Sequence, residues 1–178
     1  LYMLPSFHER LIAGVATYAM ELVEAAPDLD AVYAPIGLGS GLCGIISARD
    51  ALGLKTEVIG VVAEGAPCYA LSFEAGAPVS TNAADTMADG MACRTPVPAA
   101  VVTINAGAAR VVRVSDSEIM TAMRAYFTDC HNVVEGAGAA PLAALIQEAA
   151  RMRGKRVGLV LSGGNIDRSL YLSALQAE

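Results

Sequence analysis

Two glycine-rich segments have the residue types and the spacing needed to hold an anionic ligand. The first, PIGLGSGLCG at 35–44, lies between an apolar run and a helical pattern, and from Gly39 it reads G-x-G-x-x-G. Free backbone N–H groups at a helix start bind anions, and glycine lets a phosphate approach the backbone closely. The second, SGGN at 162–165, offers the Ser162 hydroxyl as a donor or acceptor. Taken alone, either segment is also compatible with a simple turn.

Two further segments combine a carboxylate with small residues. In HNVVEGAGAA at 131–140, Glu135 precedes the small-residue start of an expected helix. An acid at that position either compensates the helix dipole or faces a pocket. The segment TMADGMA at 86–92 contains the turn signal Asp-Gly and no obvious chemistry of its own.

One interpretation of the first segment is a nicotinamide dinucleotide site. Glu64 ends the next apolar run, EVIGVV, at about the 20-residue distance where a ribose-binding acid lies. Gly39–Gly44 with Glu64 would then make this an NAD(P)-binding Rossmann-type protein. That interpretation leaves 86–90 and 162–165 unexplained, and a helix precedes the loop where the first strand should begin.

Apolar runs alternate with helical patterns along the chain, which positions these segments at strand ends. The strands are expected at 31–35, 57–62, 110–114 and 156–161, the first a short strand and the second and fourth buried. The helices are expected at 11–23, 45–52, 66–75, 98–107, 115–128 (with a Ser115–Glu118 capping box), 136–153 and from 168. This order predicts an α/β fold with an open, mainly parallel sheet and helices on both faces.

Composition excludes several classes of protein. The chain has 178 residues, a net charge of -6 and 54% hydrophobic residues, so we expect no nucleic-acid partner, because phosphate binding needs clustered Lys and Arg. Its four cysteines show no C-x-x-C spacing, which indicates reduced thiols in a cytoplasmic protein and no zinc site. Its longest run without a charged residue, 31–48, is interrupted by Pro35 and the glycine segment, so we expect no membrane insertion.

The order of the motifs is more specific than any one of them. From the N-terminus they are T-Y-A-M-E-L at 17–22, P-I-G-L-G-S-G at 35–41, T-M-A-D-G at 86–90, E-G-A-G-A-A at 135–140 and L-S-G-G-N-I-D at 161–167. In this order they resemble the fold-type II pyridoxal-phosphate enzymes, in particular the threonine/serine dehydratase and serine racemase family. The resemblance covers the C-terminal part of such an enzyme. It implies that 1–178 is a single-domain fragment, most of the cofactor-binding large domain, without the N-terminal segment and the small domain.

The resemblance implies roles for individual residues in binding pyridoxal 5'-phosphate. Ser162, with Gly163 beside it, would bond the pyridine nitrogen, and Glu135 matches an acid near the ring. The phosphate would be bound by the backbone amides of Gly37, Leu38, Gly39, Ser40 and Gly41. The family usually shows four consecutive glycines here, so Leu38 must avoid the positive φ that non-glycine residues rarely adopt.

The family's Schiff-base lysine, in an S-x-K-x-R-G motif, has no counterpart in this chain. Its only lysines, Lys55 and Lys155, precede strands, which is the wrong end of a parallel sheet for ligand contact. We therefore expect no catalytic residue in these 178 residues. The family's cation site would place a Glu at Val62 and a carboxylate at about Cys68, so we expect no metal site of the usual kind.

The activity that the resemblance implies belongs to the whole enzyme. It is an ammonia-lyase that converts a small β-hydroxy amino acid to a 2-oxo acid and ammonia by α,β-elimination, working as a homodimer. The isolated chain should be inactive, and a non-catalytic packing or dimerisation fragment is the other alternative. The choice between dehydratase and racemase, and the identity of the amino acid, stay open.

Overall fold

Four strands form one sheet in which every neighbouring pair is parallel. The computed structural model describes residues 5–176, and its strands are β1 (Ala31–Pro35), β2 (Glu57–Ala63), β3 (Arg110–Val114) and β4 (Val157–Leu159). Their order in the sheet is β3-β2-β1-β4, with Val32 opposite Val58 and Tyr33 opposite Leu159. The predicted α/β fold with a parallel sheet is confirmed.

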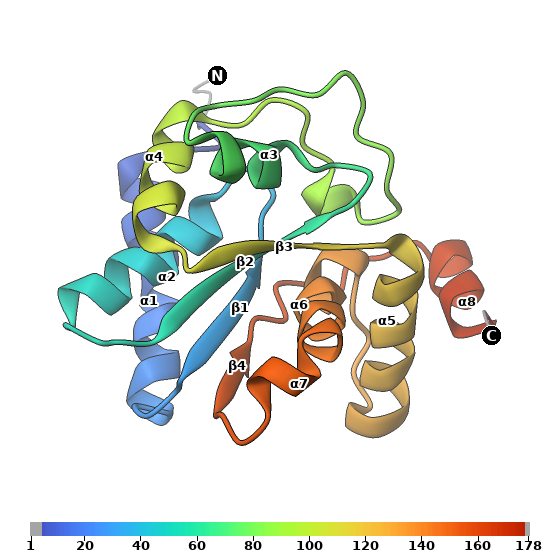
Figure 1. Ribbon diagram of the computed structural model, residues 1–178. Helices are drawn as coiled ribbons and strands as arrows, with labels where there is room; N and C mark the ends of the chain where they lie inside the picture. The colour runs from blue at the N-terminus through green and yellow to red at the C-terminus, as the bar shows by residue number, and fades with distance from the viewer. Residues whose placement is uncertain (1–4, 177–178) are drawn as a thin grey trace.

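Helices cover both faces of this sheet, as Figure 1 shows, with α1 and α2 to one side and α5 and α6 to the other. The helices are α1 (Glu9–Ala25), α2 (Ser40–Ala51), α3 (Cys68–Ala75), α4 (Pro98–Gly107), α5 (Asp116–Cys130), α6 (Gly136–Gln147), α7 (Ala149–Met152) and α8 (Arg168–Gln176), with a short 3-10 turn at Asp89–Met91.

Alternation along the strands divides the core into two clusters. Successive side chains of a strand point to opposite faces of the sheet. Ala31, Tyr33 and Ile59 are buried among residues of α5, α6 and α8, whereas Val32 and Ala34 are buried among residues of α1, α2, α3 and α4. The sheet is therefore apolar on both faces, as the uninterrupted apolar strands predict.

Three predicted elements differ from the structure. The second helix begins at Ser40, five residues before the expected Ile45, because its first turn includes the glycine segment. The helix expected over 136–153 is divided at Glu148 into α6 and α7. The prediction of a buried last strand is wrong: β4 is an edge of this sheet, its Val157 and Leu159 are only partly buried, and Leu161 beyond it is 38% exposed.

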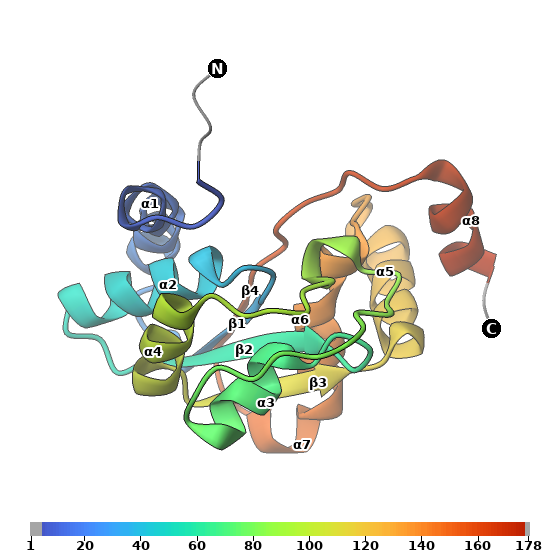
Figure 2. The ribbon, with the colours of Figure 1, turned by 90° about the horizontal axis from the view of Figure 1, so that it is seen from above.

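The strand order places a change of direction beside β1. From β1 the chain moves through β2 to β3, and it then returns to add β4 on the other side of β1. In open α/β sheets, ligands bind outside the carboxyl ends of the strands at such a switch point. Both glycine segments, 35–44 after β1 and 162–165 after β4, follow strands that meet there. Viewed from above in Figure 2, the chain after β4 runs past the start of α6 to reach α8.

Candidate functional site

Gly39 shapes the loop between β1 and α2. It is the N-cap of α2 and has a left-handed backbone, with φ 94°. A Cβ atom at this position would lie 2.9 Å from the Ala100 Cβ, so both the conformation and the space require glycine. Within residues 5–176 the only non-glycine residue with positive φ is His131, so Leu38 avoids positive φ, as predicted.

The first turn of α2 presents free backbone donors. The Cys43 N–H is the first to bond along the helix, to the Gly39 carbonyl at 2.9 Å, and the N-cap has no side-chain bond to this turn. For the amides from Gly39 to Leu42, no acceptor is found in the described residues. Unpaired N–H groups at the positive end of a twelve-residue helix form a site for an anion.

A cavity of about 400 Å³ joins the glycine loop to the segment after β4. Its wall is formed by Val15, Tyr18, Ala34, Pro35, Gly41, Val160, Leu161 and Ser162. The structure thus brings together Gly41 and Ser162, which are 121 positions apart in the sequence (162 − 41). The wall is mostly apolar, with Gly41 and the hydroxyl-bearing Ser162 among its few polar contributors, which is the composition typical of a small-molecule site.

Glu135 is a direct neighbour of Gly163. The Glu135 N–H donates to the Gly163 carbonyl at 3.1 Å, and a Cβ at Gly163 would lie 2.7 Å from the Glu135 Oε1 atom. The Glu135 side chain also lines a second, more polar cavity of about 250 Å³ with Asp89, Asn165 and Asp167. Of the predicted residues, Glu135 and Gly163 are therefore in contact, but Glu135 does not line the cavity of Gly41 and Ser162.

The segment TMADGMA has a structural role beside the glycine loop. The Thr86 hydroxyl donates to one carboxylate oxygen of Asp116 at 2.6 Å, and the Met87 N–H donates to the other at 2.9 Å. This anchor brings the Gly90 carbonyl so close to Gly37 that a Cβ at Gly37 would collide with it. The packing explains why glycine stands at 37, whereas a Cβ at Gly90 would lie 3.0 Å from the Ala137 Cβ atom.

Two tyrosines without a role in the sequence-based prediction contact the loop. The Tyr69 hydroxyl donates to the Leu38 carbonyl at 2.7 Å, and the Tyr18 hydroxyl donates to the Gly41 carbonyl at 3.4 Å. Burial raises the pKa of Tyr18 to about 12 and also raises the pKa of Tyr69, so both hydroxyls stay protonated at neutral pH. Tyr18 lies in a motif of the sequence, whereas no local pattern indicates Tyr69.

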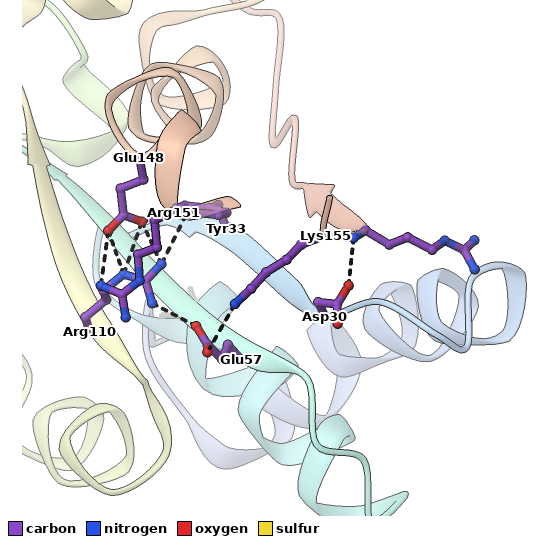
Figure 3. Close-up of polar contacts among 8 residues, drawn as sticks. Asp30, Tyr33, Glu57, Arg110, Glu148, Arg151 and Lys155 are labelled. Atoms are coloured by element: carbon purple, nitrogen blue, oxygen red, sulfur yellow. Dashed lines mark hydrogen bonds and ion pairs between the residues drawn. The ribbon is translucent and has the colours of Figure 1, made fainter. Parts of the chain in front are cut away.

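Both lysines lie at the opposite end of the sheet. Lys55 and Lys155 line a polar cavity at the amino ends of the strands with Asp30 and Glu57. The Lys155 Nζ atom is 3.8 Å from the Glu57 Oε1 atom. Figure 3 shows the two side chains pointing toward each other. Their predicted position, away from the glycine loop, is confirmed, and neither lines the cavity of Gly41 and Ser162.

The positions of the expected cation ligands are buried. Val62 and Cys68 are at most 1% exposed, and neither offers a side-chain oxygen. Across residues 5–176, no three His, Cys, Asp or Glu side chains are grouped closely enough to hold a metal ion. In the same part of the chain, no helix combines the length and the apolar character needed to cross a membrane.

Comparison with protein families identifies the class to which the chain belongs. The family described as "Pyridoxal-phosphate dependent enzyme" matches residues 1–163. The chain is a member of this family, so the predicted resemblance is confirmed, and pyridoxal phosphate is the family's cofactor. The matches give no support to the alternative of an NAD(P)-binding protein.

The curated relatives that the chain matches include dehydratases and an ammonia-lyase. The chain is 37% identical to the beta-hydroxyaspartate dehydratase of Paracoccus denitrificans, covering 89% of this chain and 50% of the relative. It is 36% identical to the phenylserine dehydratase of Ralstonia pickettii (91% and 50%) and 31% identical to the L-threonine ammonia-lyase of Thermotoga maritima (94% and 41%). The chain thus spans about half the length of the curated relatives it matches.

Solved structures support the same family. The processed form of threonine deaminase isoform 2 from Solanum lycopersicum superposes with a TM-score of 0.91 at 26% identity, covering 98% of this chain and 52% of that one. The serine racemase of maize gives a TM-score of 0.84 at 27% identity, covering 92% and 51%. The fold and the parallel sheet are those of these enzymes.

Proposed function

We propose that this chain is most of the cofactor-binding domain of a pyridoxal-phosphate-dependent ammonia-lyase. The whole enzyme would convert a small β-hydroxy amino acid to a 2-oxo acid and ammonia. One observation carries the proposal: Gly41, whose amide has no acceptor in the described residues, and Ser162 line a single cavity at the switch point of the sheet. The names of the relatives, dehydratases and ammonia-lyases of hydroxy amino acids, support the reaction class.

The residues at and beside the cavity have the polar groups that the cofactor needs. The backbone amides of 37–41 would hold the phosphate, and Ser162, with Gly163 beside it, would bond the pyridine nitrogen. Glu135 would lie near the ring, held by its contact with Gly163. When bound, the cofactor supplies an electron sink for removing the β-substituent. A hydroxyl partner leaves the pyridine nitrogen largely unprotonated, which suits β-elimination better than transamination.

The Schiff-base lysine would come from a part of the protein outside these 178 residues. Neither Lys55 nor Lys155 approaches the cavity, so the chain alone should bind cofactor without turning over substrate. We propose that the whole enzyme works as a homodimer in the cytoplasm, where reduced cysteines without a disulfide framework are expected.

Absorbance spectroscopy of the full-length protein tests this function. Pyridoxal phosphate should produce a visible band of bound cofactor, and L-threonine, L-serine, 3-hydroxyaspartate or phenylserine should change it. Release of ammonia and a 2-oxo acid identifies a dehydratase, whereas formation of the D-isomer identifies a racemase. A protein that binds NADH and gives no band with pyridoxal phosphate would contradict the proposal.

A further inference from the structure

Two tyrosine hydroxyls reach the glycine loop from different helices. Tyr69, on α3, donates to the Leu38 carbonyl at 2.7 Å, and Tyr18, on α1, donates to the Gly41 carbonyl at 3.4 Å. Neither hydroxyl is needed to complete a helix or a strand. Tyr69 thus contacts the loop before α2, and Tyr18 contacts the first turn of α2.

Tyr69 is the more tightly held of the two. Its side chain is 1% exposed, and its oxygen also accepts the Val97 N–H at 3.0 Å. Val97 is the N-cap of α4, and the same helix brings Ala100 against Gly39. The hydroxyl thus joins the loop to α3 and α4 through one buried oxygen.

A contact to the carbonyl of a peptide also sets the direction of the N–H of that peptide. A trans peptide is planar, and its C=O and N–H point in opposite directions. Because the Leu38 carbonyl points to Tyr69, the N–H of the same peptide, on Gly39, points away from Tyr69. In the same way, the Gly41 carbonyl on Tyr18 sets the direction of the Leu42 N–H. Neither the Gly39 N–H nor the Leu42 N–H has an acceptor in residues 5–176.

We propose that Tyr69 is a positioning residue for the cofactor's phosphate, with Tyr18 as a weaker second. Its hydroxyl would hold the Leu38–Gly39 peptide so that the free amides face the anion before it binds. The inference rests on the proposed function, and it assigns to Tyr69 an effect on the phosphate and none on the ring. Preorganised donors bind more tightly than donors that must be ordered on binding.

Replacing Tyr69 with Phe in the full-length protein tests this role. The dissociation constants of pyridoxal phosphate and of pyridoxal, which lacks the phosphate, are measured for wild type and variant. Tyr69→Phe should weaken binding of pyridoxal phosphate about tenfold (about 1.4 kcal/mol), because the Gly39 N–H is then no longer held toward the charged phosphate. Pyridoxal binding should stay within about twofold, because it lacks the charged group.

Tyr171→Phe is the matched control. The Tyr171 hydroxyl is buried and has no partner among the described residues, so the same chemical change removes no contact to the loop. This variant should bind both compounds as wild type does. Tyr18→Phe should show the same preference for the phosphate with a smaller loss, about twofold to threefold, because its bond is longer.

The outcomes separate this inference from the proposed function. Wild type that binds pyridoxal and pyridoxal phosphate equally would contradict the phosphate site itself. Wild type that prefers the phosphate, with Tyr69→Phe unchanged or weakened equally for both compounds, would overturn the role of Tyr69 alone. Should Tyr69→Phe not fold, Tyr18→Phe decides: an equal loss for both compounds, or no loss, overturns the inference.

Discussion

The carboxyl ends and the amino ends of the strands differ in the residues they carry and in how their polar groups are paired. At the carboxyl ends of the strands, glycines bring backbones together and leave amides without acceptors in the described residues. At the amino ends, charged side chains pair with one another, as Figure 3 shows. One end therefore has backbone donors without an acceptor in the described residues, whereas the other uses its polar groups to hold the elements together.

The paired end is centred on Arg110, at the start of β3. Its guanidinium contacts Glu148 at 2.6 Å and Glu57 at 2.9 Å, and the Tyr33 hydroxyl donates to Glu148 at 2.5 Å. Burial, with the hydrogen bond to Glu148, raises the pKa of Tyr33 to about 12. These contacts join β1, β2 and the α6–α7 junction to β3.

The largest expected effect follows from breaking this pairing. Arg110→Met should lower the free energy of unfolding by about 3 kcal/mol, because it leaves the largely buried Glu148 without its main partner. Arg113→Met, on the same strand, is the control. Its side chain is 36% exposed and paired with exposed Glu74, so about 1 kcal/mol or less is expected. Urea unfolding measures both variants. Equal losses of the free energy of unfolding would show that the Arg110 ion pairs stabilise the fold no more than the exposed pair does.

The next largest effect should appear at the ligand end. Gly39→Ala places an alanine at φ 94° and against Ala100. The backbone strain alone costs about 1–3 kcal/mol. We expect the loop to relieve this strain by moving, which should weaken binding of pyridoxal phosphate about tenfold or more.

Gly76→Ala is the control for Gly39→Ala. Gly76 also has a positive φ, 69°, but no atom lies within 4 Å of its added Cβ. It should cost some stability and leave cofactor binding unchanged. Spectroscopic titration of the full-length variants measures this, and similar binding losses for both would mean that strain, and not the loop, is responsible.

A smaller effect is expected from a single hydroxyl of the paired end. Tyr33→Phe removes the hydrogen bond to Glu148 and retains the buried ring, so the free energy of unfolding should fall by about 1 kcal/mol. Thermal unfolding with Tyr171→Phe as the reference checks it, since Tyr171 has a buried hydroxyl without a partner in residues 5–176. A loss of stability no larger than that of Tyr171→Phe would show that the Tyr33 hydroxyl does not contribute to the pairing around Arg110.

The smallest effect concerns pH. The hydrogen bond from Arg110 lowers the pKa of Glu57. Burial acts to raise the pKa of Glu148, but the hydrogen bonds from Arg110 and Tyr33 outweigh it, so that pKa also lies below its ordinary value. The stability contributed by a lowered pKa is present above the unfolded value, about 4.3, and is lost as pH falls through the folded value.

Glu148→Gln isolates this dependence, because glutamine does not titrate. Below about pH 4.3 the free energy of unfolding should fall less steeply in the variant than in wild type. Urea unfolding at a series of pH values measures the two slopes. Parallel curves would show that Glu148 binds protons equally in the folded and unfolded states.

Local patterns predicted the elements that local residues determine. The strands at 31–35 and 110–114, the helix at 98–107 and the capping box of Ser115 and Glu118 were all predicted correctly. The glycine segments were also located, because few other residues fit a loop of that kind. The proposed roles of Ser162 and Glu135 come from the resemblance and stay predictions.

Long-range contacts explain what the sequence did not reveal. Glycine has a low helix propensity, yet α2 begins within the glycine segment because Gly39 caps it and Gly44 packs against α1. The helix break at Glu148 has no local signal, and the carboxylate at this position binds Arg110, 38 positions away. Tyr69 was missed for the same reason, because its partner Leu38 is 31 positions away.

An NMR titration can show whether the free amides of the ligand end receive the cofactor's phosphate. The full-length protein, labelled with ¹⁵N at glycine and leucine, is titrated with pyridoxal phosphate and the amide resonances are followed. We expect the largest shifts at Gly39, Gly41 and Leu42, with smaller changes on adding pyridoxal. Largest shifts at Gly53 or Gly154, at the lysine-bearing end of the sheet, or equal shifts with both compounds would contradict this assignment of the phosphate site.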